Sequence, residues 1–142
     1  MIYLDANVFV YAALNQKTIG DKARSIIREV QRGKFVAVTS ALSFDELVWA
    51  VKKQRGETEG ALAGEVFLGM PRLTILDVKQ ELLSSALSLI RAYHLHPRDS
   101  IHAASALSIG ADYIVSEDRD YDALEAEIRR KPILGVSTSP GA

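Results

Sequence analysis

Four acidic residues stand where apolar segments of this chain begin or end, and their side chains are the ones best suited to do chemistry. If the fold brings them together, they form a pocket of oxygen ligands, which suits a hard divalent ion. Such an ion polarises a phosphoryl oxygen and lowers the pKa of a bound water, which is the chemistry of phosphodiester hydrolysis. Without the ion, the carboxylates should repel one another and resist full ionisation. The four residues are Asp5, Glu46, Asp99 and Asp118.

Each of the four also has a purely structural interpretation. Asp5 directly follows an apolar segment, and it could cap a helix that starts near Asn7. A carboxylate at the end of a core strand is nevertheless costly unless a partner or an ion compensates it, which favours the ligand interpretation. Asp99 could be a first-turn charge that the helix dipole favours. The spacing does not decide whether Asp45 or Glu46 turns toward the pocket.

Two features next to these acids leave further alternatives open. His102 lies three residues after Asp99, on the same helix face, and it could be a metal ligand, a base or a packed residue satisfied by a hydrogen bond. The packed interpretation is favoured, because the other candidate ligands are all oxygens. In the acidic turn over residues 116–122, Asp118 and Asp120 could share one ion, or Asp120 could cap the next helix.

The elements that must position these residues alternate between short apolar strands and longer helices. This alternation indicates an α/β fold with a parallel sheet that is covered on both faces. Ligands gather beyond the carboxyl ends of such strands, where Asp5 and Asp118 lie. We expect strands over residues 2–4, 36–39, 73–76 and 113–115, with a short edge strand over 132–134. We expect helices over residues 8–14, 20–32, 41–54, 59–68, 82–90, 97–109 and 121–130.

Length and composition narrow the possible classes of protein. The chain has 142 residues, which fits a single domain over residues 1–142. Its net charge of -1 gives no overall basic footprint for nucleic acid, although an enzyme could hold one through metal ions and local basic patches. The absence of cysteine excludes disulfides, zinc–thiolate sites and thiol nucleophiles. No apolar run reaches membrane-spanning length and no secretion signal opens the chain, so we expect a soluble cytoplasmic protein.

Four sequence motifs, taken in order, resemble those of PIN-domain nucleases. Each motif is loose alone, but the four together at these spacings are fairly specific, and the resemblance covers essentially the whole chain. Its length and order of elements are similar to those of the small stand-alone members, the VapC-type toxins of prokaryotic toxin–antitoxin pairs. The motifs are Ile2-Tyr3-Leu4-Asp5-Ala6-Asn7, Glu46-Leu47, Asp99-Ser100-Ile101-His102-Ala103-Ala104 and Ser116-Glu117-Asp118-Arg119-Asp120-Tyr121.

The resemblance implies a fold, a cofactor and a reaction. The fold is a central parallel sheet of four to five strands flanked by helices on both faces. The cofactor is Mg²⁺ or Mn²⁺, and the reaction is endonucleolytic cleavage of RNA. By position, Asp5, Glu46, Asp99 and Asp118 match the acidic quartet of the family, so the resemblance selects Glu46 over Asp45.

Other positions of the family pattern carry supporting roles. Asn7 and Ser116 match polar positions near the site, and Asp120 is a further supporting candidate. Arg98 and Arg119 are the best candidates to bind RNA, because each adjoins an acidic candidate. The sequence departs from the pattern at Ala6, where many relatives carry a hydroxyl residue, so a hydrogen bond from that hydroxyl is missing here.

The resemblance also implies two protein partners, an antitoxin that covers the acidic pocket and a second copy of this chain. The sequence supports them only through bulky apolar residues that one small core would not fully bury. These residues are Phe44, Trp49, Val66 and Phe67.

Two other functions compete with a nuclease. A non-catalytic receiver-like signalling domain also gathers acids at strand ends, but it needs paired N-terminal acids and a lysine after a late strand. Asp5 has no acidic neighbour, and Ser116 and Glu117 stand where the lysine would be. A phosphohydrolase with an aspartyl nucleophile usually carries a second aspartate two residues after the first, where this chain has Asn7.

Overall fold

Five short strands form one sheet in the order β3–β2–β1–β4–β5, and every neighbouring pair of strands is parallel. The structure is a computed structural model that describes residues 1–139. The sheet confirms the expected α/β fold with four to five parallel strands, and it places β1 at the centre. The strands are β1 (Ile2–Leu4), β2 (Ala37–Ser40), β3 (Leu73–Leu76), β4 (Tyr113–Val115) and β5 (Arg129–Lys131).

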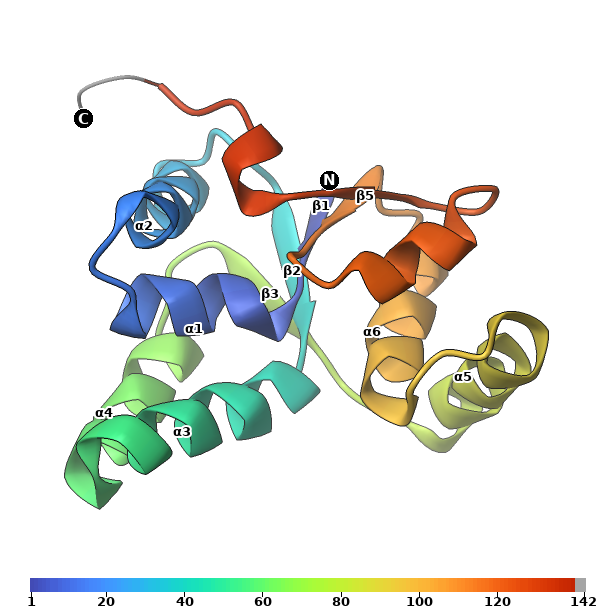
Figure 1. Ribbon diagram of the computed structural model, residues 1–142, viewed down its shortest axis with the longest axis horizontal. Coiled ribbons are helices and arrows are strands. Elements are labelled where there is room, and N and C mark those ends of the chain that lie inside the picture. Colours follow the sequence, from blue (N-terminus) through green and yellow to red (C-terminus); the bar gives the residue numbers. More distant parts are fainter. Residues whose placement is uncertain (140–142) are drawn as a thin grey trace.

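Helices cover both faces of the sheet, as Figure 1 shows. The first four lie on one side, and α5 and α6 lie on the other. No helix within residues 1–139 is long and apolar enough to cross a membrane. The α-helices are α1 (Ala6–Leu14), α2 (Thr18–Gln31), α3 (Leu42–Arg55), α4 (Glu57–Leu68), α5 (Gln80–Tyr93) and α6 (Pro97–Ser108), and two 3₁₀ helices are η1 (Arg119–Leu124) and η2 (Ile133–Gly135).

The alternation of side chains along β1 divides the interior into two cores. Ile2 and Leu4 pack into the core beneath α1 to α4, whereas Tyr3 points to the opposite face and packs beneath α5 and α6. All three side chains are buried. Successive residues of a strand face opposite sides, so three apolar residues in a row are what a central strand with two covered faces requires.

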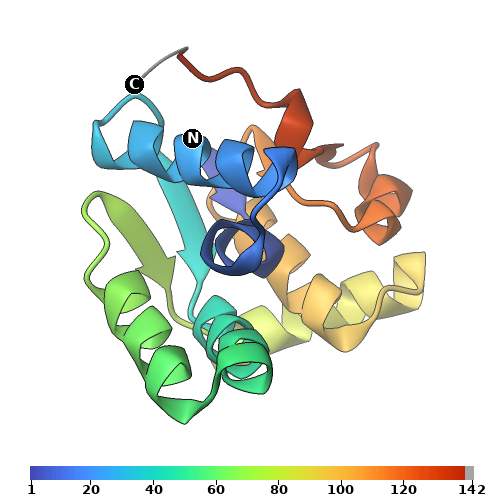
Figure 2. The same ribbon diagram turned by 60° about the vertical axis from the view of Figure 1, so that its left-hand side comes forward.

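Helices α3 and α4 run side by side as a hairpin, which Figure 2 shows from the side. Gly56 joins them with a φ of 93°, a conformation that residues with a side chain rarely adopt. Gly60 and Gly64 are buried where the two helices touch. A Cβ at Gly60 would lie 2.9 Å from the Cβ of Lys52, so only glycine permits this close approach.

The expected last helix and edge strand are both wrong. Residues 121–130 were expected to form one helix, but the chain forms the short η1 and then the strand β5. The expected strand over 132–134 is instead the turn η2. Tyr121, Leu124 and Ile128 are indeed buried. Their spacing also fits an α-helix, but the three-residue period of η1 buries the first two equally well.

Candidate active site

The four expected carboxylates line a single pocket of about 250 Å³. Asp5 follows β1, Glu46 lies in the second turn of α3, Asp99 in the first turn of α6, and Asp118 caps η1 after β4. The expected convergence is therefore observed, at the carboxyl end of the central strands. Because a water molecule takes about 30 Å³ in the liquid, the pocket has room for an ion with bound water beside a phosphate group.

Asp5 combines two roles that its place after β1 allows. Its Oδ1 accepts a hydrogen bond of 2.8 Å from the backbone N–H of Ala6, so it caps α1. Its Oδ2 accepts a hydrogen bond of 2.6 Å from the Ser116 hydroxyl and one of 3.2 Å from the Asn7 amide. Burial raises the pKa of Asp5 above its usual value, even though His102 and these donors favour the charged form.

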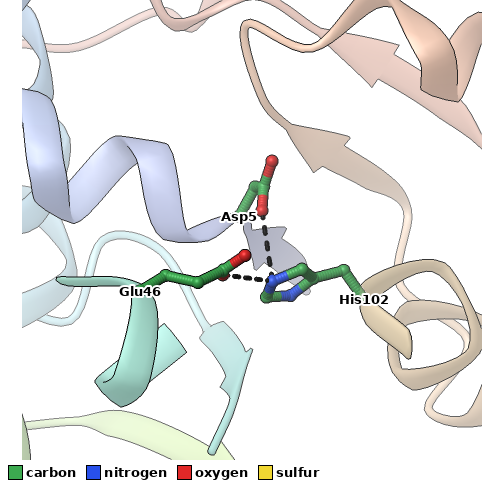
Figure 3. Close-up of side chains that lie close together, drawn as sticks. All are labelled: Asp5, Glu46 and His102. Atoms are coloured by element: carbon green, nitrogen blue, oxygen red, sulfur yellow. Dashed lines mark hydrogen bonds and ion pairs between the residues drawn. The ribbon is translucent and has the colours of Figure 1, made fainter. Parts of the chain in front are cut away.

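His102 joins two of the carboxylates to the core, as Figure 3 shows. Its Nε2 lies 2.8 Å from Glu46 Oε2 and 3.4 Å from Asp5 Oδ1, and its Nδ1 lies 2.7 Å from the Tyr3 hydroxyl. The side chain is only 1 % exposed. Burial alone would lower the pKa of His102, but the hydrogen bond with Glu46 and the charge of Asp5 raise it above its usual value. His102 is therefore buried and hydrogen-bonded, as the packed interpretation expects, and it also lies close enough to Asp5 and Glu46 to share an ion with them.

A second acidic group contributes two of its three members, Asp99 and Asp118, to the pocket. Carboxylate oxygens of Asp99, Asp118 and Asp120 lie within 4.8 Å of one another. Burial, and then repulsion from Asp118, raise the pKa of Asp99 to about 7. The direction of this shift agrees with the expected repulsion among the carboxylates. Asp118 Oδ1 accepts a hydrogen bond of 2.9 Å from the Asp120 backbone N–H, so the residue that caps η1 is Asp118 and not Asp120.

A comparison with known protein families supports what this geometry indicates. A model of the PIN domain family matches residues 2–127, which is most of the chain. The chain belongs to the PIN domain family. The family resemblance found in the sequence is thereby confirmed. No curated protein sequence matches this PIN domain significantly.

Solved structures share the fold of this PIN domain at low sequence identity. The toxin VapC20 of Mycobacterium tuberculosis, described as cleaving the sarcin–ricin loop, is 16 % identical, with a TM-score of 0.70 over 87 % of this chain and 95 % of its own. A chain of VapBC2 from Rickettsia felis, bound to a DNA fragment from its promoter, is 20 % identical, with a TM-score of 0.70 over 93 % and 98 %. A chain of VapBC-1 from nontypeable Haemophilus influenzae is 17 % identical, with a TM-score of 0.67 over 94 % and 99 %.

The supporting residues of the PIN domain form a polar network behind Asp5. The Asn7 amide donates to the Ser116 hydroxyl at 3.0 Å, and that hydroxyl also accepts the backbone N–H of Asp118 at 3.0 Å. Ser116 thus links the carboxylate after β1 to the one after β4. Ala6 contributes only its backbone N–H to this network.

Of the two arginines expected to bind RNA, only Arg98 is part of the acidic pocket of this PIN domain. Arg98 is exposed and lines the pocket. Among the described residues, Arg119 and Asp120 do not line it.

Asp45 lines the pocket but is exposed, whereas the side chain of Glu46 is 19 % exposed and is held by His102. These contacts agree with the selection of Glu46 over Asp45.

Three residues at the site were not site candidates in the sequence analysis. Tyr3 was treated only as a strand residue, although its hydroxyl contacts His102. Val10 and Trp49 line the pocket. Trp49 lies three residues after Glu46, which places both on one face of α3, so helical spacing was a signal that could have found it.

The pocket of this PIN domain fits a divalent ion by three observations. Its acidic donors are oxygens, the ligands that Mg²⁺ and Mn²⁺ prefer. Burial and repulsion from Asp118 raise the pKa of Asp99, and a bound cation would relieve that repulsion. Asn7 Oδ1 is buried and accepts no hydrogen bond from residues 1–139, which leaves an oxygen free for a bound water.

Proposed function

We propose that this PIN domain is an endoribonuclease that requires Mg²⁺ or Mn²⁺. The observation that carries the proposal is the convergence of four carboxylates from separate elements on one pocket. Asp5, Asp99 and Asp118 would hold the ion, directly or through water. A bound ion supplies a polarised phosphoryl oxygen and a water of lowered pKa. Neither a receiver-like domain nor an aspartyl-nucleophile phosphohydrolase accounts for the position of Glu46 in this cluster.

The side chains of the pocket have distinct tasks in this reaction. Glu46 orients the attacking water or helps to hold the ion, and its hydrogen bond with His102 fixes its carboxylate. Arg98 lies at the pocket and can neutralise a phosphate of the RNA, as arginine commonly does. Asn7 and Ser116 keep Asp5 in place through their hydrogen bonds.

We also infer that the protein is the toxin of a toxin–antitoxin pair and acts in the cytoplasm on RNA. The similarity in fold to VapC20 and to toxin chains of two VapBC complexes supports this role. This chain offers the antitoxin an apolar groove between α1 and α4, where Leu62 and Val66 are 50 % and 58 % exposed. A gene for a small antitoxin beside the gene for this chain would distinguish a toxin from a housekeeping nuclease.

A homodimer is the second proposed assembly. Phe44 and Val66 keep 38 % and 58 % of their surface exposed, whereas Trp49 lines the acidic pocket and Phe67 is buried and offers nothing to a partner. Exposed apolar side chains of this size are common at interfaces between subunits. Light scattering at high protein concentration should report twice the mass of one chain, and a monomer would refute the dimer.

One assay tests the catalytic proposal. Single-stranded RNA is incubated with the wild type, Asp5→Asn, Asp99→Asn and His102→Ala, each with Mn²⁺ and with a chelator. We expect the chelator and both asparagine variants to stop cleavage, because the ion and its ligands supply several kcal/mol of transition-state stabilisation. His102→Ala should keep reduced activity, since it loosens Glu46 without removing an ion ligand.

The same assay includes the result that would reject the mechanism. A histidine-based reaction without metal would survive chelation and disappear in His102→Ala. Full activity of Asp99→Asn would equally contradict the proposal. Glu125→Gln is the matched control, because Glu125 is an exposed acid outside the pocket, and it should cleave RNA like the wild type.

A further inference from the structure

The only tryptophan of the chain stands at the mouth of the acidic pocket. Trp49 lines the pocket together with the four carboxylates, yet 59 % of its surface is exposed. An indole in a protein core normally buries a large apolar area, and this one leaves most of it to water. A flat, exposed ring beside a proposed reaction centre is suited to stack on a flat ligand.

Trp49 shares its face of α3 with a carboxylate and a cation. Glu46 lies three residues before Trp49 and the exposed Lys53 lies four residues after it, so the three are neighbours along the helix surface. This stripe turns away from the core, which Leu47 and Val51 of the same helix enter. At a rise of 1.5 Å per residue, the stripe extends about 10 Å outward from Glu46.

We propose that Trp49 is a stacking platform for one unpaired base of a single-stranded RNA whose scissile phosphate lies at the carboxylates. The inference rests on the proposed ribonuclease function and assigns a subsite next to that centre. Aromatic side chains stack on bases of any kind, because every base has a π-face. Arg98 lines the same pocket and the exposed Lys53 follows Trp49 by four residues on α3, so both can attract the phosphates of neighbouring nucleotides.

Charge around Trp49 favours a nucleobase over an apolar protein segment. The pocket residues next to it on α3 are the acids Asp45 and Glu46, whereas the exposed apolar residues Leu62 and Val66 line a separate groove. Acidic neighbours repel a phosphate, but they do not repel an uncharged base. Stacking therefore gives this RNA a contact that the acidic surface does not weaken.

The test uses the emission of Trp49 in the full chain that carries Asp99→Asn, a variant expected not to cut RNA. Since the chain has one tryptophan, the emission reports on this position alone. An unstructured RNA of about eight nucleotides is titrated in, a length within the usual site sizes. A ribose-phosphate oligomer of equal length without bases is the control. We expect RNA to quench the emission and the oligomer without bases to leave it unchanged.

Variants then measure the contribution of the ring to affinity. In the Asp99→Asn background, anisotropy of a labelled RNA should show that Trp49→Ala weakens binding about tenfold, the usual effect of one lost stacked base. Trp49→Phe keeps an aromatic face and should keep most of the affinity. Leu68→Ala is the matched control, because Leu68 is an apolar residue with 62 % exposure outside the pocket, and it should leave affinity unchanged.

Two results would overturn the subsite. One is equal RNA affinity with and without the indole of Trp49. The other is an emission that shifts with protein concentration but not with RNA, which would place the ring between two copies of the chain. Quenching by RNA without any cleavage by the wild type would refute the proposed function and leave the subsite standing.

Discussion

Among the candidate residues, Asp5 was the most informative about where the site lies. The sequence allowed a ligand or a helix cap, and the structure shows the cap together with a place in the pocket. The place of Asp5 directly after an apolar strand indicated a functional role, because a carboxylate there needs a partner or an ion to compensate its charge. The contact of His102 with Asp5 and Glu46 could not be predicted from the sequence. His102 lies 97 residues after Asp5 and 56 after Glu46, so no local pattern connects them.

The Tyr3 hydroxyl provides the first test at the residue scale. Tyr3→Phe removes the hydrogen bond of 2.7 Å to His102 and leaves its Nδ1 buried without a partner. We expect a loss of about 1–3 kcal/mol in the free energy of unfolding, measured by urea denaturation. Tyr11→Phe, at a partly exposed tyrosine, should change it by less than about 0.5 kcal/mol. An equally small loss for Tyr3→Phe would contradict the proposed importance of this contact.

The raised pKa of Asp99 predicts how stability without metal depends on pH. The folded state has a pKa of about 7 at this carboxyl, whereas an unfolded chain has about 3.9. Between these values the folded state binds a proton that the unfolded state releases, so the free energy of unfolding falls as pH rises. In chelator, Asp99→Asn should remove part of this fall from pH 5 to 7.5.

Urea denaturation of both proteins across this pH range measures the difference. The variant should be the more stable of the two already at pH 5, where Asp99 is ionised only in the unfolded state, and the difference should grow until about pH 7, where the folded wild type loses this proton. Asp5 and His102 also have raised pKa values and act in the same direction, so the variant should retain some slope. Parallel curves for the two proteins would show that Asp99 does not titrate in this range.

At the scale of elements, apolar patterns predicted those segments that have a buried face. The strands over 73–76 and 113–115 have the expected bounds, and most helices start within two or three residues of the expected position. Strand β5 escaped prediction because it consists of Arg129, Arg130 and Lys131. Charged residues suit an edge strand, and here Arg130 pairs with Asp122 while Lys131 covers the ring of Tyr113. The spacing of apolar residues does not predict a strand that is held by contacts of charged side chains.

The contact between α3 and α4 predicts a strong effect of one methyl group. Gly60→Ala would place its Cβ 2.9 Å from the Cβ and 3.2 Å from the Cα of Lys52, so the two helices must separate. Overpacking costs about 1–3 kcal/mol and exceeds the gain in helix propensity of up to about 1 kcal/mol. Thermal denaturation should show a lower Tm. Gly69→Ala is the control, because its nearest atom lies at 3.5 Å, and a similar Tm for both variants would contradict the close packing.

At the scale of the whole molecule, the order of the strands is what assembles the site. The sequence predicted a parallel sheet, but local patterns do not state that β1 lies between β2 and β4. That order follows when the chain adds strands on one side of β1 and then crosses to the other side, with right-handed connections. Only then do the residues after β1 and β4 meet, as the hydrogen bond between Ser116 and Asp5 records.

Because the proposed ion joins α1, α3, α6 and η1, it should stabilise the entire fold. An ion at one hundred times its Kd adds about 2.7 kcal/mol, which raises the Tm of a domain of this size by roughly 5–10 °C. We expect this rise with millimolar Mn²⁺ for the wild type and little of it for Asp99→Asn. Glu125→Gln should respond like the wild type. An unchanged Tm of the wild type would remove the main support for the metal site.

The pairing of β1 with β4 has a consequence for the newborn chain. Asp5 leaves the ribosome more than a hundred residues before Ser116 and Asp118. Until they emerge, the carboxylates of the early segments have no partners on the other side of the sheet. A nascent chain that still lacks these residues therefore has an incomplete pocket.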